Sequence, residues 1–143
     1  MENNENRQSS LLKLRPIVEN AKVNSNTLDE EAFQNRTLRP IAKFQNDLLI
    51  EVFKIYINYR KNKFYTLNLE SKLKYIEDAV KKDSKLRRQL QGIFIGLFSI
   101  EEYHKYSKNY KAFNKRINNL CIERLKSNIQ LFEKEETDSN LSK

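Results

Sequence analysis

The scarcity of chain-reversing residues is the feature that most constrains the fold of this sequence. Among its 143 residues there are only two glycines and two prolines. A sandwich or meander of short strands needs turn residues about every 8–12 positions, and this chain does not supply them. The helix-favouring residues Leu, Ile, Lys, Glu and Gln are abundant. The sequence therefore predicts an all-α protein whose helices are joined by short, capped connections.

The length of the chain favours one domain with one hydrophobic core. We expect residues 11–132 to form a single compact helical bundle of about four to six helices. Residues 1–10 and 133–143 are polar, and the second stretch is acidic, so we expect both to be disordered tails. Residues 11–26 begin with an apolar but irregular stretch and are expected to form an arm on the bundle.

The strongest helical pattern covers residues 38–62. Its apolar residues recur every three or four positions and predict one buried stripe. The stripe consists of Ile41, Phe44, Leu48, Val52, Ile55 and Tyr59. The residues expected to widen it are Leu38, Leu49, Phe53 and Tyr56.

Other helices are predicted to begin where a Ser, Thr, Asn or Asp can accept hydrogen bonds from first-turn amides. These N-cap residues are Thr27, Asn68, Asp83 and Ser99. Thr27 and Ser99 are each followed three residues later by Glu, which makes a capping box. The last helix is expected to span residues 108–132.

The tetrapeptide Leu-Arg-Pro-Ile occurs twice, at residues 14–17 and 38–41. In the second copy we expect Thr37 or Asn35 to cap a helix with Pro40 in its first turn, where proline loses no hydrogen bond. In the first copy, we expect proline to push Arg15 toward an extended conformation within the apolar arm. The structural motif at the second copy comprises Thr37, Leu38, Arg39, Pro40 and Ile41.

Gly92 and Gly96 lie one helical turn apart. Each costs about 1 kcal/mol relative to Ala inside a helix, which calls for a reason. The pair predicts close approach of another helix. This face, or exchange of the arm at residues 11–18, could also join two copies into a homo-oligomer.

The charge distribution points to a macromolecular partner. The net charge is +8, with seven basic and two acidic residues at 36–63, and seven and one at 105–132. A basic surface of this kind favours an acidic protein or a nucleic acid. Candidate contact residues in a Tyr/Lys-rich stretch are Tyr103, Lys105, Tyr106, Lys108, Lys111, Lys115 and Arg116. Candidates at a helix junction, where an N-terminus could bind an anion, are Lys81, Lys82, Lys85, Arg87 and Arg88.

Two binding functions remain open at this point. The leading hypothesis is a non-enzymatic binding or scaffold protein whose basic surface contacts an acidic protein. The alternative is RNA or DNA binding, in which tyrosines stack on bases and lysines neutralise phosphates. Tyr103, Tyr106 and Tyr110 are spaced three and four apart, which is also the spacing of a half-buried helical stripe.

Catalytic and cofactor motifs are missing from the sequence. There is no phosphate loop, no dinucleotide fingerprint, no His-Glu-x-x-His and no Cys-x-x-Cys. The single histidine, His104, forms Glu-x-x-His with Glu101, but a second such motif is absent. Cys121 lies beside an apolar stripe, where we expect an inert core thiol. We therefore predict no catalytic residue, no metal site and no cofactor.

Sequence features also indicate the compartment. One cysteine permits no intramolecular disulfide, which fits a reducing environment. The longest apolar run, Gly92–Ile100, is far shorter than the roughly 20 residues that span a bilayer. The N-terminus lacks a basic and apolar leader. We expect a cytoplasmic protein without a membrane span.

Three stretches of the chain resemble a group of small, uncharacterised, all-helical bacterial proteins. Members share Thr-Leu-Arg-Pro-Ile before Lys-Phe-Gln-Asn, then Gly-Leu-Phe before Glu-Glu-Tyr, then Asn-Lys-Arg-Ile, here at 37–46, 96–103 and 114–117. The resemblance covers residues 11–132 and implies an all-helical fold. Some members carry the label "glyoxalase", which implies a lyase. The residues disfavour that activity, because glyoxalases bind metal through several His, Glu or Gln ligands and this chain has one His.

Overall fold

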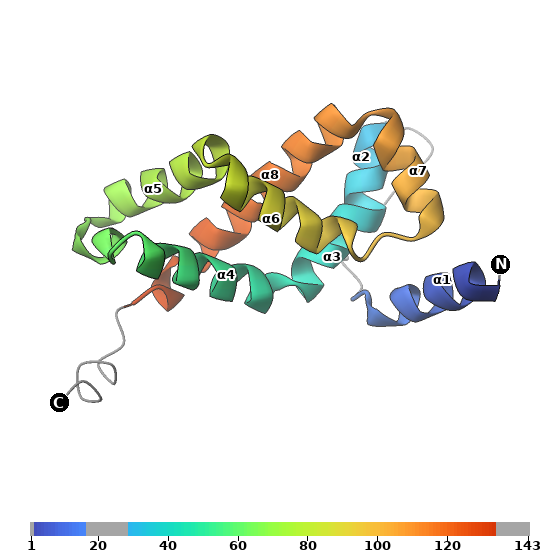
Figure 1. Ribbon diagram of the computed structural model, residues 1–143, viewed down its shortest axis with the longest axis horizontal. Helices are drawn as coiled ribbons and strands as arrows, with labels where there is room; N and C mark the ends of the chain where they lie inside the picture. Colours follow the sequence, from blue (N-terminus) through green and yellow to red (C-terminus); the bar gives the residue numbers. More distant parts are fainter. Residues whose placement is uncertain (1, 17–28, 134–143) are drawn as a thin grey trace.

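The computed structural model describes residues 2–16 and 29–133, and every regular element in these residues is a helix (Figure 1). The helices are α1 (Glu2–Leu14), α2 (Asp29–Phe33), α3 (Arg39–Phe44), α4 (Asn46–Tyr59), α5 (Leu69–Lys82), α6 (Ser84–Ile95), α7 (Ile100–Lys108) and α8 (Tyr110–Ser127). A π-helical turn, Gln34–Leu38, joins α2 to α3, and 3₁₀ turns occur at Lys63–Thr66 and Ile129–Leu131. The all-α prediction is confirmed, although the described chain divides into more and shorter helices than expected.

Helix α8 is the centre of the structure. It runs the length of the bundle (Figure 1) and packs against α3, α4, α5, α6 and α7. Its apolar side is fully buried at Ile117, Cys121 and Leu125. The other helices therefore share one core built around α8.

Aromatic side chains close the core at both ends of the bundle. At the α4–α5 end, the ring of Phe53 lies 5.9 Å from that of Phe64 and 5.3 Å from that of Phe132. At the α2–α7 end, the ring of Phe33 lies 5.6 Å from Phe98 and 4.5 Å from Phe113. The members of each cluster come from distant parts of the sequence, so their packing joins helices that are far apart along the chain.

The face that α4 turns toward the core is not the one that the sequence pattern predicted. Of the expected stripe Ile41 is buried, but Phe44, Leu48, Ile55 and Tyr59 are exposed. Three of the residues expected to widen it are buried as predicted, namely Leu38, Leu49 and Phe53. The buried residues of α4 are Leu49, Ile50, Phe53 and Ile57. The prediction was wrong because α4 is apolar on both sides, so periodicity alone does not choose a face. A break at Gln45 also separates α3 from α4 and turns the second helix relative to the first.

Helix α3 begins within the second Leu-Arg-Pro-Ile copy with Pro40 in its first turn, as expected, but no side chain caps it, because it continues directly from the π-helical turn. Leu38 already has helical dihedral angles, and the amide of Arg39 donates to the carbonyl of Gln34, five residues earlier. Pro40 has no amide hydrogen, and its ring would crowd the carbonyl four residues before it in a regular helix. The wider π-helical turn relieves this crowding. Thr37 therefore lies inside a continuous helical segment and caps nothing.

Three of the predicted N-caps are confirmed. The side chain of Asn68 accepts a 2.8 Å hydrogen bond from the amide of Ser71 at the start of α5. Asp83 accepts from the amide of Leu86 at the start of α6, and Ser99 forms the full capping box with Glu102. Thr27 lies outside the described residues. The predicted helix over residues 108–132 is interrupted at Asn109 and regular only through Ser127.

The N-terminal segment differs from the expected disordered tail. Residues 2–14 form α1, and Leu11 on this helix is buried. The physical reason is a set of polar contacts from Arg7 and Arg15, described below, which no local sequence pattern shows. Residues 17–26 of the expected arm and residues 134–143 of the expected acidic tail lie outside the described part of the chain.

The two glycines do not admit a neighbouring helix. A Cβ atom on Gly92 would meet nothing within 4 Å, and one on Gly96 would meet the carbonyl of Gly92 at 3.2 Å. Both residues are exposed. The predicted close approach is therefore wrong for residues 2–16 and 29–133, and Gly96 instead ends α6. None of the helices in these residues is long and apolar enough to cross a membrane.

Candidate interaction surface

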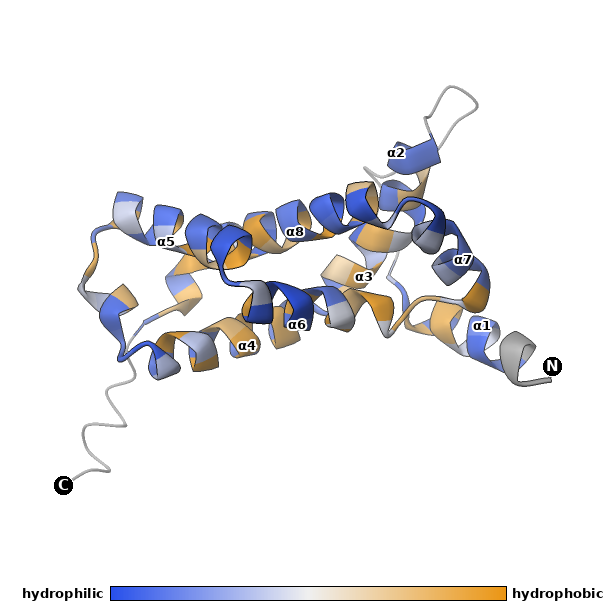
Figure 2. Ribbon diagram, turned by 45° about the horizontal axis from the view of Figure 1, so that its top comes forward, coloured by the Kyte–Doolittle hydropathy of each residue, from blue (hydrophilic) through white to orange (hydrophobic). Residues whose placement is uncertain are grey.

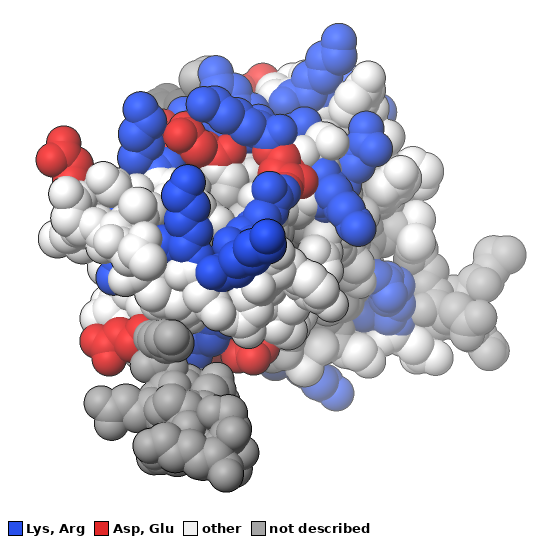
Figure 3. Space-filling view, turned by 60° about the vertical axis from the view of Figure 1, so that its left-hand side comes forward, with Lys and Arg blue, Asp and Glu red and all other residues white. Residues whose placement is uncertain are grey.

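The two predicted contact clusters lie at different places on the bundle. Residues 81–88 surround the junction of α5 and α6, whereas residues 103–116 cover α7 and the start of α8 (Figure 1). Figure 3 views the molecule from the α5 end and shows Lys and Arg gathered toward its top, with Asp and Glu among them. The two clusters do not converge on one pocket. Each is therefore compared by which of its cations have ion-pair or hydrogen-bond partners within the protein.

At the α5–α6 junction, three of the five predicted cations are engaged within the protein. Lys81 lies 2.6 Å from Glu77 and Lys82 lies 3.6 Å from Asp78, both as pairs one helical turn apart. Arg87 donates to the carbonyl of Lys81 at 2.7 Å. Lys85 and Arg88 are exposed, and no described acidic side chain pairs with them. Only these last two remain available to a partner.

The N-terminus of α6 is not an open anion site. The carboxylate of Asp83 accepts hydrogen bonds from the amides of Lys85 and Leu86, each at 3.1 Å. These bonds, the Leu86 amide foremost, hold the pKa of Asp83 below its usual range. Arg60 lies 2.5 Å from the same carboxylate. The protein therefore supplies its own anion at the position where an external one was expected.

In the Tyr/Lys-rich stretch, the structure separates exposed residues from buried ones. Tyr106 is buried and its hydroxyl donates to Asn114 Oδ1 at 2.5 Å, so we withdraw it from the contact set. Arg116 contacts Gln34 at 3.0 Å and Glu30 at 3.6 Å and holds α8 to α2. The exposed members are Tyr103, Lys105, Lys108, Lys111 and Lys115.

Four exposed cations flank the contact between α6 and α8. Gln91 Nε2 on α6 donates to Asn118 Oδ1 on α8 at 2.9 Å, and the two helices run in opposite directions (Figure 1). Arg88 and Lys115 each precede this pair by three residues, and residues three or four apart share a helix face. Lys85 lies one turn before Arg88 on α6, and Lys111 lies one turn before Lys115 on α8, and both are exposed. We call Lys85, Arg88, Lys111 and Lys115 the α6/α8 basic face.

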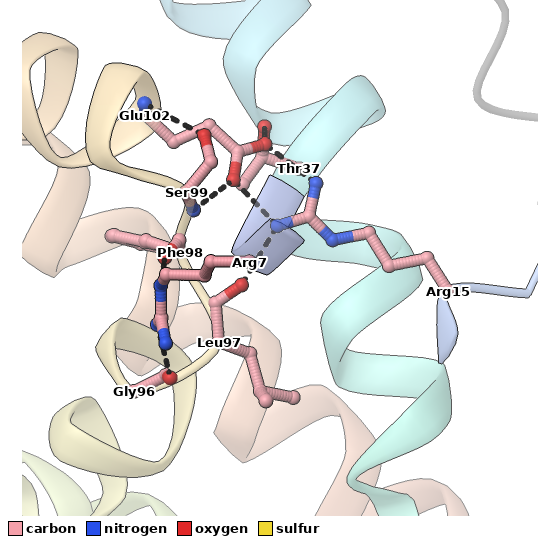
Figure 4. A network of polar contacts seen from close by, with 8 residues as sticks. All are labelled: Arg7, Arg15, Thr37, Gly96, Leu97, Phe98, Ser99 and Glu102. Atoms are coloured by element: carbon pink, nitrogen blue, oxygen red, sulfur yellow. Dashed lines mark hydrogen bonds and ion pairs between the residues drawn. The ribbon is translucent and has the colours of Figure 1, made fainter. Parts of the chain in front are cut away.

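A second candidate is a hollow of about 780 Å³ between α1, α2 and α7. Its floor is apolar and includes Leu11, Phe33 and Phe113, and both basic and acidic side chains surround it. One wall is formed by Arg15, Glu102 and Thr37 (Figure 4). The sequence pattern gave no sign of this arrangement, because its members come from three separate segments.

The polar groups of this wall pair with one another, except for Arg15 Nε, which is buried without a hydrogen-bond partner. Arg15 donates to both carboxylate oxygens of Glu102, at 2.5 and 2.6 Å, and to the carbonyl of Leu97 at 2.8 Å. The hydroxyl of Thr37 donates to Glu102 at 2.7 Å. Arg7 donates to the carbonyls of Gly96 and Phe98 (Figure 4). Both arginines thus bind carbonyls of the connection that follows α6 and attach α1 to the bundle.

Glu102 is held in its ionised form. Burial opposes its charge, since only 16% of the side chain is exposed. Hydrogen bonds from Arg15, the Ser99 amide and Thr37 outweigh that burial and lower the pKa of Glu102 below its usual range. The chemistry of the wall is therefore that of a structural ion pair between α1 and α7.

The residues considered for catalysis are not assembled with partners. Burial raises the pKa of the Cys121 thiol to about 12, which keeps it protonated and unreactive. Glu101 and His104 lie exposed on α7. In residues 2–16 and 29–133, no three His, Cys, Asp or Glu side chains lie close enough together to hold a metal ion.

No family model matches this chain, and no curated protein or solved structure is significantly similar to it.

Proposed function

We propose that this is a non-enzymatic protein of the cytoplasm that binds an acidic protein through the α6/α8 basic face. The observation that carries the proposal is the contrast between engaged and free cations. Lys81, Lys82 and Arg116 have acidic partners within the chain. No described acidic side chain neutralises the α6/α8 basic face, and α6 contains no acidic residue at all.

Electrostatic complementarity of this kind steers association and selects partners more than it adds affinity. Four cations spread over two adjacent helices suit a carboxylate-rich helix or loop of a partner. They do not form the compact, buried cluster that would bind a single small anion. The proposal therefore names an extended acidic surface as the ligand.

Nucleic acid is the second candidate, and Tyr103 and Tyr110 favour it. Both rings are about half exposed, at 49% and 52%, and stand close to Lys105, Lys108 and Lys111. Burial of Tyr106 removes the middle ring of the expected stacking row. Because base stacking contributes about 1–3 kcal/mol per base, this loss weakens the case for single-stranded nucleic acid.

The test uses two variants of the full chain that remove equal charge. In the first, Lys85, Arg88, Lys111 and Lys115 are replaced by Gln. In the control, four exposed lysines elsewhere are replaced, namely Lys13, Lys61, Lys63 and Lys74. Each protein is used as bait in affinity purification from the native cell, with and without nuclease.

We expect a protein partner to be recovered by the wild type and by the control, in the presence of nuclease, and to be lost with the first variant. Recovery should fall as salt is raised. Equal recovery by both variants would contradict the proposed surface. A partner that disappears only on nuclease treatment would identify the nucleic-acid alternative. Turnover of methylglyoxal with glutathione and divalent metal would establish the lyase alternative instead.

A further inference from the structure

The outer side of α4 carries a row of apolar side chains that nothing in the described chain covers. Phe44, at the end of α3, and Leu48, Ile55 and Tyr59 on α4 are 44%, 46%, 48% and 84% exposed. Leu48, Ile55 and Tyr59 are seven and four residues apart and share one side of α4, and Phe44 ends α3 shortly before it. In Figures 1 and 2, α4 lies along the lower edge of the molecule, on its outside. We call these four residues the outer α4 stripe.

This stripe is more than scattered surface hydrophobicity. Single exposed apolar residues are normal on a soluble protein, whereas a contiguous row marks a contact surface. The opposite side of α4 already packs Leu49, Phe53 and Ile57 into the core. A helix that is apolar on both sides is typically buried on both sides. We therefore expect another molecular surface to pack against the stripe.

The charges beside the stripe identify which occupant fits. Asp47, Glu51 and Lys54 lie along one flank of α4 at steps of four and three residues. No described side chain forms an ion pair with any of the three. Along the chain, this flank reads acidic, acidic, basic. A copy of the same helix laid antiparallel reads basic, acidic, acidic, and sets each Lys54 between Asp47 and Glu51 of the other copy.

The apolar residues obey the same symmetry. When two α4 helices run antiparallel about a two-fold axis near residues 51 and 52, Phe44 stands opposite Tyr59 and Leu48 opposite Ile55. A two-fold contact must be self-complementary in this way, because both copies present the same patch. A parallel pairing would instead place the two charged flanks on opposite sides of the contact, where Lys54 meets neither Asp47 nor Glu51 of the other copy.

We propose that the outer α4 stripe is the contact surface of a homodimer in which two copies pair antiparallel through α4. The contact uses neither of the two features that suggested an oligomer in the sequence, the glycine pair and the arm. One helix of this length buries less than the roughly 800 Å² per partner of a standard interface. The dimer is therefore a weak one that forms reversibly in the micromolar range.

Sedimentation velocity of the full chain from about 1 to 200 µM tests the proposal, since micromolar affinity corresponds to a transition in this range. The wild type should pass from monomer to dimer. Leu48→Glu and Ile55→Glu should each weaken self-association by at least about tenfold, because each buries a charge in the contact. Leu69→Glu, at an apolar residue 62% exposed on α5, should leave self-association unchanged. Circular dichroism establishes that each variant is folded.

Charge reversal tests the antiparallel arrangement. Lys54→Glu and the double variant Asp47→Lys, Glu51→Lys should each be monomeric when alone, because like charges then face each other. An equimolar mixture of the two should form a heterodimer. Cysteines at 48 in one copy and 55 in another should crosslink under oxidation, and two cysteines at 48 should not.

Three results would overturn the proposal. A monomer throughout the concentration range would leave the stripe to some other occupant. A dimer that survives Leu48→Glu would place the contact on a different face. Crosslinking between two cysteines at 48 in preference to 48 with 55 would show a parallel pairing.

Discussion

At the residue scale, side chains of the same type and similar spacing take opposite roles in this protein. Tyr103 and Tyr106 are three residues apart, yet the first is about half exposed and the second is buried against Asn114. Lys81 on α5 is paired with Glu77, while Lys85, four residues later on α6, has no described acidic partner. For the tyrosines the difference arises from the helix that packs across from α7, and for the lysines from an acidic residue one turn earlier on the same helix. A contact set chosen by residue type alone therefore contains both free and engaged members.

Cys121 offers a test at this scale. Burial raises the pKa of its thiol to about 12, so at pH 8 almost none of it is thiolate. We expect no measurable reaction of the native protein with a disulfide reagent, and one thiol titrated after denaturation. A Lys74→Cys variant provides a matched exposed thiol that should react at once. Labelling of native Cys121 at the rate of that control would show that the core around α8 opens readily.

At the scale of elements, capping signals located helix boundaries better than apolar periodicity located helix faces. Asn68, Asp83 and Ser99 each begin a helix because a local hydrogen bond to first-turn amides does not depend on the rest of the fold. The stripe predicted over residues 41–59 points outward along α4, because that choice depends on neighbours. Because no described neighbour buries it, the outer α4 stripe is a candidate contact surface.

Pro40 tests the account of the π-helical turn. Replacing Pro40 with Ala restores an amide donor and removes the ring that crowds the preceding carbonyl, so the segment can adopt a regular helix. The substitution also deletes buried carbon atoms and increases the freedom of the unfolded chain. We expect a folded protein whose free energy of unfolding is lower by about 1–2 kcal/mol. Urea denaturation followed by circular dichroism measures the change, and failure of the variant to fold would contradict the account.

At the scale of the whole molecule, α1 is attached by charge as much as by apolar contact. Arg7 and Arg15 reach carbonyls of the connection that follows α6 and Glu102 on α7, some 80 to 90 residues away in sequence. The pair Arg15–Glu102 is largely buried, with 10% and 16% of the side chains exposed. An isolated charge at that position would be costly, so removal of either partner should release α1.

The pKa of Glu102 makes this attachment dependent on pH. Because the pKa is lower in the folded protein than in the unfolded chain, the ionised carboxylate contributes stability above the ordinary Glu value, near 4.3. That contribution is lost as the pH falls through the folded-state value. Hydrogen exchange of residues 2–14, corrected for intrinsic rates, should rise as the pH falls below the ordinary Glu value while the bundle remains helical. Glu102→Gln should show fast exchange already at pH 7, and equal protection at all pH values would refute the link.

The sequence by itself determined the helical class, three N-caps, the inert setting of Cys121 and the basic character of the surface. These follow from few turn residues, local hydrogen bonds and charge counts, none of which requires knowledge of distant contacts. Tertiary structure alone decided which side of α4 is buried, that Tyr106 is buried while Tyr103 is exposed, and that α1 lies against α6 and α7. Those outcomes depend on pairs such as Arg15 with Glu102, whose members are 87 positions apart. Only folding brings such residues within a few ångströms of each other. Tertiary contacts then determine which of two equally apolar helix faces is buried.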